Sequence, residues 1–428
     1  MYMNLPKDEF LLTLGMFAIV LLMCTTEIFF LWKWLHKPKN KKQLADYAPL
    51  RMMRFLPSLM EGLIAPFIII ELLKMAERSG LVGAFYATLP LSICMAVGGI
   101  TCIFVGRILH VLGTKKTLYL AFALFLTCGI ILLTGNNYYL WILALAFQGA
   151  ALELLFDSIG MLAGLTVDED EQRQAFAGIT AGEATGTCVG AGICSLLLLF
   201  ISEKAVLFTY CTVAILGMCL TSLTQNYFVP IKSSHDEDGI SLKEFLTKRE
   251  VFSFLILIFG VLLVIREYKV VSMPIYFASQ GISEVTISRI FMLFGLCACY
   301  LGPTLTDFLG KRLSGLQAVL APNIVVILGM LPFVIYPNVY TIVLACFISQ
   351  LSYTFGFPCQ NTFYTNLEAS QHFGVSKAQN IIFFAESFFY SVGPLFLGAL
   401  IQSFGVEMSA GILAGIMGGF VAAYLKLK

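Results

Sequence analysis

The chain turns at Gly106-Arg-Ile-Leu-His-Val-Leu-Gly-Thr-Lys-Lys116, a short basic hinge between two long apolar segments. Its glycines permit a tight turn of the backbone, and its lysines are typical of the cytoplasmic side of a membrane. Further along, a comparable stretch, Pro303-Thr-Leu-Thr-Asp-Phe-Leu-Gly-Lys-Arg312, joins two other apolar segments. The recurrence predicts a chain built from two related halves.

Composition places the chain among membrane proteins. Of its 428 residues 58% are hydrophobic and only 12% are charged, whereas soluble proteins average about a quarter charged residues. The 27 basic and 26 acidic residues nearly cancel, so nothing indicates a nucleic-acid partner. Twelve cysteines lie mostly within apolar segments and have no metal-ligand spacing. No phosphate-binding glycine loop or catalytic triad is recognisable, so we expect no cofactor, no metal site and no enzyme.

Thirteen apolar runs are long enough to cross a bilayer, which takes about 20 residues each. The first, residues 10–35, is too long for a signal-peptide core and is followed by lysines, so we expect a retained anchor. The twelve others, called helices one to twelve, are predicted at residues 54–76, 82–106, 117–135, 138–166, 173–202, 205–225, 250–277, 282–309, 314–336, 338–366, 374–402 and 405–426. The fold class is therefore an all-α polytopic membrane protein.

Basic residues orient these spans. If the loop after the first span is cytoplasmic, twenty of the 27 lysines and arginines fall on the inner side, which places the N-terminus outside and the C-terminus in the cytoplasm. The longest later connection divides the twelve helices six and six, and Ser241 is a candidate cap for a short helix within it. The predicted units are residues 1–50 (extra helix and basic loop), 51–225 (N-terminal bundle), 226–249 (linker) and 250–428 (C-terminal bundle).

The two hinges resemble the loop signature of the major facilitator superfamily, roughly Gly-x-Leu-Ala-Asp-Arg-x-Gly-Arg-Lys between the second and third helices of each half. In the first copy Gly106, Gly113 and Lys115 match it, while His110 stands where the family usually has Asp. In the second copy Pro303 replaces the first glycine, and the matching residues are Asp307, Gly310, Lys311 and Arg312. The resemblance implies two six-helix bundles of this type, here with one extra N-terminal transmembrane helix.

The resemblance also implies roles for helices and hinges. Helices one, four, seven and ten would line a central cavity, and helices three, six, nine and twelve would face lipid. Helices three, six and nine contain no charged side chains, and helix twelve has them only at its ends. The hinge residues would control the opening of the cytoplasmic side, with Lys115, Lys311 and Arg312 contacting opposing carboxylates or helix C-termini when that side is closed.

Charged side chains at membrane depth are costly and normally face a cavity or a partner. Glu61 lies in helix one, and Glu153 and Asp157 share one face of helix four at i and i+4. Two carboxylates this close in a poorly hydrated site resist carrying charge together, so one could hold a proton near neutral pH. The alternative is that each carboxylate accepts hydrogen bonds or balances a basic group without a role in coupling.

Helix seven carries Arg266, Glu267 and Lys269 near its middle. Arg266 and Lys269 share a helical face, with Glu267 turned about 100° away, so a basic surface is predicted to face the cavity. This surface could bind an anionic or carboxylate-bearing solute, or it could form structural ion pairs across the cavity.

Three further residues are candidates for solute binding, coupling or the bundle interface. Glu183 lies in helix five within Gly182-x-x-x-Gly186-x-x-x-Gly190, a spacing that permits close helix packing. Glu386 lies in helix eleven, and Tyr353 lies in helix ten before a break predicted at Gly356 and Pro358. Each could instead be structural.

These features predict a secondary transporter that moves a small charged or zwitterionic solute by alternating access, driven by a proton or other ion gradient. The alternatives are a multidrug or organic-ion exporter, or a facilitator fold that has become a non-transporting sensor or scaffold subunit. The expected partners are the lipid bilayer and a small-molecule substrate, and the expected state is a monomer in the cell membrane.

Overall fold

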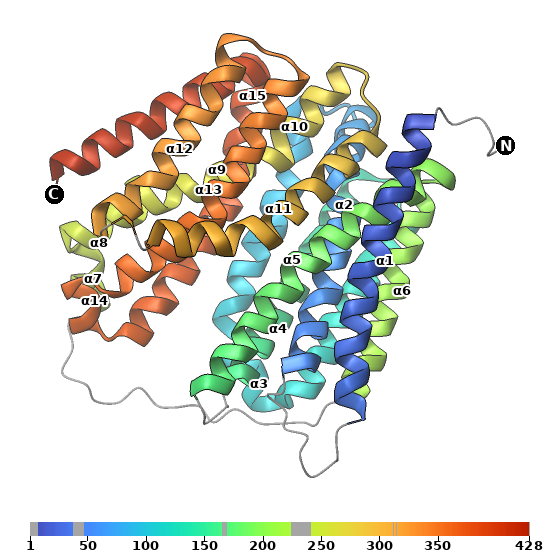
Figure 1. Ribbon diagram of the computed structural model, residues 1–428, viewed down its shortest axis with the longest axis horizontal. Helices are drawn as coiled ribbons and strands as arrows, with labels where there is room; N and C mark the ends of the chain where they lie inside the picture. The colour runs from blue at the N-terminus through green and yellow to red at the C-terminus, as the bar shows by residue number, and fades with distance from the viewer. Residues whose placement is uncertain are drawn as a thin grey trace.

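A computed structural model describes residues 7–36, 47–164, 169–223, 241–310, 312–313 and 315–427. The described chain is helical (Figure 1). Its elements are α1 (Lys7–Leu35), α2 (Tyr47–Arg78), α3 (Ala84–Thr134), α4 (Tyr138–Gly164), α5 (Glu169–Phe200), α6 (Glu203–Ser222), α7 (Leu242–Thr247), α8 (Arg249–Ser253), the π-helix η2 (Phe254–Phe259), α9 (Gly260–Arg266), α10 (Tyr268–Ser279), α11 (Glu284–Gly310), α12 (Gly315–Ile335), α13 (Val339–Thr365), α14 (Glu368–Phe373) and α15 (Val375–Leu427).

Eleven helical segments in the described chain are long and apolar enough to span a membrane. Two of these segments, in α3 and α15, are each 51 residues long, about twice the length that one crossing needs. Each is broken by a glycine with positive φ, Gly113 (φ 75°) and Gly405 (φ 78°), a conformation that other residues rarely adopt. The two breaks add two crossings to the eleven segments, which confirms the thirteen predicted spans.

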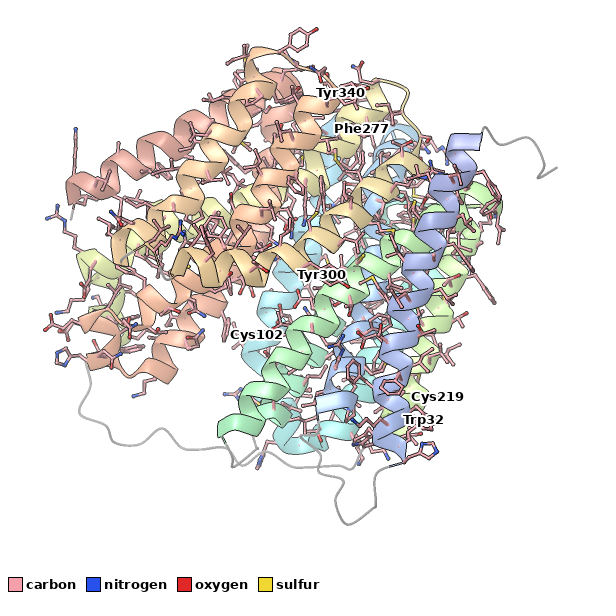
Figure 2. The ribbon with its side chains drawn as sticks, in the orientation of Figure 1. Trp32, Cys102, Cys219, Phe277, Tyr300 and Tyr340 are labelled. Atoms are coloured by element: carbon pink, nitrogen blue, oxygen red, sulfur yellow. The ribbon has the colours of Figure 1, made fainter. Side chains whose placement is uncertain are left out.

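The extra helix α1 is followed by an N-terminal half, α2 to α6, and a C-terminal half, α8 to α15. We call the end of the molecule that carries the turn at Gly113 and the start of α8 the basic end. The other end, at the turns near Gly281 and Gly405, is called the opposite end. Figure 2 shows Trp32 and Cys219 near the basic end, and Phe277 and Tyr340 near the opposite end.

Local details refine the predicted elements. Ser241 caps α7 as expected, since its side chain accepts a hydrogen bond from the Glu244 amide. The rest of the predicted linker, residues 226–240, lies outside the described residues. The predicted break in helix ten is wrong, because α13 continues through Pro358. Helix seven is instead the irregular one: it contains the π-helix η2 and is interrupted at Glu267.

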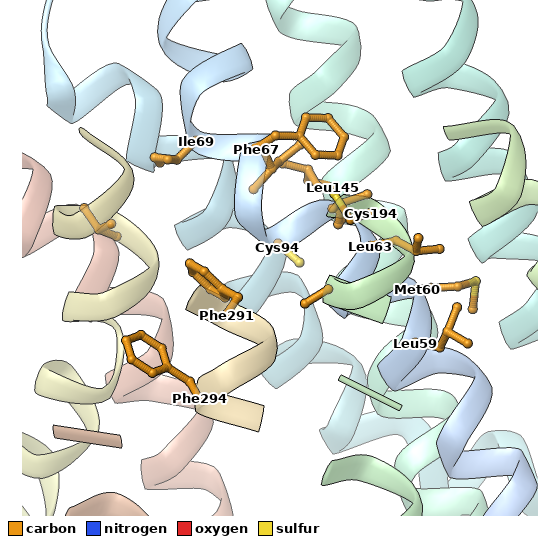
Figure 3. Close-up of a cluster of buried hydrophobic side chains, with 14 of the residues drawn as sticks. Leu59, Met60, Leu63, Phe67, Ile69, Cys94, Leu145, Cys194, Phe291 and Phe294 are labelled. Carbon is orange, nitrogen blue, oxygen red and sulfur yellow. The ribbon is translucent and has the colours of Figure 1, made fainter. Parts of the chain in front are cut away.

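The two halves share one hydrophobic core. Figure 3 shows Phe291 and Phe294 of α11 in the same cluster as Leu63, Phe67 and Cys94 of the N-terminal half. A second, smaller cluster lies within the C-terminal half around Phe245, Phe254 and Tyr364. Burial of apolar side chains therefore joins the halves as well as the helices within each half.

Polar contacts between the halves lie toward the opposite end. Among the described residues, the Phe85 amide donates to Gln402 Oε1 (3.1 Å), Ser391 Oγ to the Ser92 carbonyl (3.2 Å), and Lys74 Nζ to Glu284 Oε1 (3.1 Å). At the basic end the halves diverge (Figure 1). The structure is therefore closed at the opposite end.

Glycines set the distance between α2 and α5. A Cβ atom added to Gly182, Gly186 or Gly190 would collide with the α2 backbone carbonyls of Arg51, Phe55 and Leu59, respectively. Backbone cannot move aside as a flexible side chain can, so only glycine permits this approach. The spacing noted in the sequence thus brings helices one and five into contact.

We predict that Gly186→Ala destabilises the protein, since overpacking a fitted site costs about 1–3 kcal/mol. The apparent Tm of the purified protein in detergent should fall by several degrees. The matched control is Gly419→Ala, because a Cβ there meets no atom within 4 Å. Equal melting of the two variants would show that the close packing of α2 and α5 does not limit stability.

Candidate substrate site

The first part of the site joins α2 to α5. Arg54 Nη2 pairs with Glu183 Oε2 at 3.0 Å, and its guanidinium lies 4.2 Å from the centroid of the Phe156 ring on α4. The Arg54 side chain is only 7% exposed, whereas that of Glu183 is 36% exposed. Glu183 therefore neutralises a buried arginine and still presents part of its carboxylate to open space.

Arg54 is a site residue that the sequence reading missed. The sequence predicts that helix one begins at residue 54, which assigns Arg51 and Arg54 to the basic residues of the preceding loop. In the structure α2 already begins at Tyr47, which places both arginines on the helix. The available signal was the spacing of Arg54 and Glu61, seven residues apart, which puts both on one helical face.

The second part of the site is the carboxylate pair of α4. Glu153 and Asp157 lie beside Cys102 of α3, and one ligand atom from each of the three residues lies within 4.8 Å of the others. Figure 2 places Cys102 at the side of the N-terminal half that faces the C-terminal half. The predicted pairing of Glu153 with Asp157 on one face is confirmed, and neither carboxylate forms an ion pair among the described residues.

The third part of the site comes from the C-terminal half. Arg266 donates hydrogen bonds to the Tyr390 hydroxyl on α15 and, at 3.5 Å, to the Tyr353 hydroxyl on α13. Its guanidinium lies 4.6 Å from the centroid of each ring, and Tyr390 donates to Tyr353 at 2.9 Å. Glu386 lies one turn before Tyr390 and interacts with both hydroxyls. The two phenols thus hold Arg266 beside Glu386.

The sequence also did not predict Tyr390 as a site residue, because an aromatic residue in an apolar helix is typical of the hydrophobic core. Its position four residues after Glu386 was the signal, because residues at i and i+4 lie on one face.

Lys269 extends the basic surface. Its ammonium group donates a hydrogen bond to Gln350 Oε1 on α13, so Arg266 and Lys269 both reach the face of α13 that carries Gln350 and Tyr353. The expected shared basic surface is therefore present, although the helix is interrupted between the two residues at Glu267. The Glu267 side chain lies within electrostatic range of both cations.

The parts from the two halves meet at Glu61. Its carboxylate lies within electrostatic range of Arg54 and Glu183 on one side and of Arg266 and Glu267 on the other. Glu153 is likewise within range of Glu386 across the halves. The charged residues of the site are Arg54, Glu61, Glu153, Asp157, Glu183, Arg266, Glu267, Lys269 and Glu386. Six carboxylates thus face three basic groups, and of these nine described residues Arg54 and Glu183 alone form an ion pair with each other.

Among the described residues, two groups of side chains have a geometry that could hold a cation. One is Cys102 with Glu153 and Asp157, and the other is Glu71 with Glu203 and Glu284 near the opposite end. In the second group Lys74 already lies among the carboxylates, with its Nζ 2.5 Å from Glu71 and 3.1 Å from Glu284. A lysine therefore supplies the positive charge there.

The structure describes part of each hinge. Gly106 and Gly113 lie in α3, and Lys115 Nζ donates to the carbonyl of Ser222, the last residue of α6, at 2.9 Å. Lys115 thus contacts a helix C-terminus in its own half, and its expected contact in the state closed at this end stays a prediction. Arg312 lies 4.0 Å from the centroid of the Phe308 ring. Lys311 and the side chain of Asp307 lie outside the described residues, and Gly310 ends α11.

Two helical halves around a charged centre, with eleven apolar membrane-length segments, define a multi-pass membrane transporter. The family model described as Major Facilitator Superfamily matches residues 111–375, and the chain belongs to this superfamily. It is therefore a transporter and not an enzyme, and alternating access with symport or antiport is consistent with its fold. No curated protein matches the chain by sequence.

Solved transporter structures share the fold. The peptide transporter POT in complex with sulfate is 14% identical with a TM-score of 0.70, over 89% of this chain and 93% of that chain. The nucleoside transporter NupG is 14% identical with a TM-score of 0.64, over 89% and 98%. The D-xylose-proton symporter is 14% identical with a TM-score of 0.64, over 89% and 96%. At these identities the likeness establishes the fold alone.

The pair of Arg54 and Glu183 generates a stability prediction. Arg54→Gln leaves the Glu183 carboxylate unpaired and should cost about 2 kcal/mol, a value below that for a fully buried pair because Glu183 is partly exposed. Adding Glu183→Gln should restore part of the apparent Tm. The control is Lys248→Gln, which removes one partner of the exposed pair with Glu244. Strictly additive losses in the double variant would show that the two residues do not stabilise one another.

Proposed function

We propose that this protein moves a small charged or zwitterionic solute that carries an amine or another cationic group, and that a proton gradient drives the movement. The observation that carries the proposal is the charge balance of the site, with six carboxylates against three basic groups and a single ion pair. Burying this excess negative charge is unfavourable. A cationic group on the solute and protons on the carboxylates would both relieve it.

The distribution of the charges supports a solute with two ends. The N-terminal half contributes Arg54 and four carboxylates, so its part of the site has excess negative charge. The C-terminal half contributes both Arg266 and Lys269, which balance its two carboxylates, Glu267 and Glu386. In this proposal the amine of the solute lies toward the carboxylates and its carboxylate lies toward Arg266. Ligand contacts to both halves favour the state in which the halves close around the solute.

Glu153 and Asp157 are the proposed coupling groups. Their carboxylates are close neighbours beside Cys102, and two adjacent carboxylates in a poorly hydrated site favour the uptake of one proton. A bound proton lowers the free-energy cost of burying the carboxylates while the site is closed at both ends. In antiport, a cationic group of the solute would take the place of the proton on the same carboxylates. Symport and antiport therefore use the same pair.

The proposal includes topology and gating. We propose a monomer in the cell membrane with the basic end in the cytoplasm, the N-terminus outside and the C-terminus inside, since most lysines and arginines fall in sequence connections that the predicted topology assigns to that side. The units 1–50, 51–225, 226–249 and 250–428 are proposed as the moving parts and their connections. Gly106, Gly113, Lys115, Asp307, Gly310, Lys311 and Arg312 are the proposed gating residues.

Proton coupling is tested by uptake into proteoliposomes that contain a pH-sensitive dye. Amino acids, carboxylates, oxyanions and organic cations are screened with and without an inward proton gradient. Glu153→Gln and Asp157→Asn should each reduce gradient-driven accumulation by about tenfold or more, since they remove the proposed proton carriers. Glu368→Gln is the matched control, because this carboxylate is 85% exposed and pairs with the exposed His372.

Proton coupling would be contradicted if the native protein took up the solute equally with and without the proton gradient. Transport of bulky hydrophobic cations would favour the alternative function, a multidrug or organic-ion exporter. Absence of any flux, from protein shown to be folded, would favour a non-transporting role.

The orientation of the solute is tested by Arg266→Gln. For a zwitterionic solute the KM should rise about tenfold, equivalent to about 1.4 kcal/mol, because the proposed carboxylate partner is lost. The KM of the corresponding amine without a carboxylate should change little. Arg249→Gln, at an exposed arginine, serves as the control. Equal loss of affinity for both solutes would place Arg266 outside the solute contacts.

A further inference from the structure

The extra helix α1 contacts both halves of the transporter. It packs against α2 and α5 of the N-terminal half, and its first turns reach Arg289 on α11 of the C-terminal half. In Figure 1 it runs along one side of the molecule from the opposite end to the basic end. A helix that served only as a membrane anchor would need no polar contact with either half.

One attachment is to the N-terminal half. Glu27 is 2% exposed in the apolar face of α1 and accepts hydrogen bonds from Arg51 of α2, with Nε at 2.7 Å and Nη2 at 2.5 Å. Thr185 of α5 donates a third hydrogen bond at 3.1 Å. Because an uncompensated charge in this position is costly, the attachment fixes α1 to α2 and α5.

The other attachment is to the C-terminal half. Arg289 Nη1 lies 3.6 Å from Glu9 Oε1, and its Nη2 donates to Thr13 Oγ1 at 3.2 Å. The Arg289 side chain is 15% exposed and that of Glu9 is 36% exposed, so water weakens this ion pair. The attachment to the C-terminal half is therefore the more easily broken of the two.

Between the attachments, α1 covers the seam where α5 meets α11. A Cβ atom on Gly192 of α5 would lie 2.5 Å from Val20 Cγ2 and 3.0 Å from Met292 Sδ. Cys188 contacts Met23 Sδ at 3.7 Å and donates to the Met292 carbonyl at 3.5 Å. Side chains from α1, α5 and α11 thus meet at one place.

This seam must open if the transporter alternates. The halves are in contact toward the opposite end, and opening that end moves α11 away from α5. While Glu27 holds α1 to the N-terminal half, Arg289 cannot follow α11 and also keep Glu9 and Thr13. We propose that α1 is an intramolecular strap whose two attachments act in series to favour the state that is closed at the opposite end.

The strap is tested in full-length protein in lipid nanodiscs, without solute. Spin labels on non-canonical residues at Val82 and Tyr340, both exposed and in different halves toward the opposite end, report the separation by pulsed electron spin resonance. Glu9→Gln and Glu27→Gln should each raise the ratio of long to short distances by about three- to tenfold. In the double variant this ratio should rise no further than in the more affected single variant. Either substitution alone already releases one end of α1, so breaking the other attachment has no additional effect.

The control is Glu244→Gln, which removes a carboxylate from the exposed pair with Lys248 and should leave the distances unchanged. Thr13→Val provides a second, uncharged break of the attachment to α11 and should act in the same direction as Glu9→Gln. Unchanged distances in Glu9→Gln and Thr13→Val, in protein that elutes as folded, would overturn the strap. Additive effects of Glu9→Gln and Glu27→Gln would overturn the series arrangement. No solute is used, so this result is independent of the proposed transport activity.

Discussion

A charge at membrane depth must be matched by another helix or face an open space, and this constraint organises the molecule. Among the described residues four ion pairs link different helices: Arg51 with Glu27, Arg54 with Glu183, Lys74 with Glu284, and Arg289 with Glu9. The carboxylates Glu61, Glu153 and Asp157 have no such partner among the described residues. The charges thus separate into a group that joins helices and a central group of carboxylates, to which we assign the proposed solute and proton binding.

Close backbone packing places the first group. Without glycines at 182, 186 and 190, α5 could not approach α2 closely, and Arg54 would not reach Glu183 at 3.0 Å. The same residues that permit helix packing thus position a charge at the edge of the site. A stripe of small residues and a buried ion pair are, in this half, two parts of one arrangement.

The sequence predicted what depends on length and local pattern. Thirteen spans, the adjacency of Glu153 and Asp157 and the cap at Ser241 follow from hydropathy, helical spacing and side-chain chemistry. The prediction from sequence was wrong where contacts between residues far apart in the chain determine the structure. Helix one extends back to Tyr47 because Glu27 and Glu183 match its arginines, and neither partner is adjacent in sequence. Pro358 removes one backbone donor, yet α13 continues through it, since packing can outweigh a single lost hydrogen bond.

The roles of Tyr390 and Glu27 likewise could not be predicted from local sequence pattern. Each stands in an apolar run whose hydropathy resembles core or lipid-facing sequence, and each acquires its role from a residue far along the chain: Arg266 for Tyr390 and Arg51 for Glu27. Helical spacing can say which residues share a face, but the facing helix is set by tertiary packing. Site residues contributed by contacts between helices therefore need the structure.

Alternating access requires that neither closed end be so stable that the other state is depopulated, because a ligand shifts the balance only by its difference in affinity for the two states. At the opposite end the structure concentrates several contacts, including the Lys74 pair with Glu284 and the attachment of α1 to Arg289. At the basic end Lys115 donates to the Ser222 carbonyl of α6 in its own half, and His110 replaces the acidic residue of the family signature. The contacts at the opposite end favour the state that is closed there. A solute or proton that drives the cycle must therefore favour opening of the end that α1 holds closed.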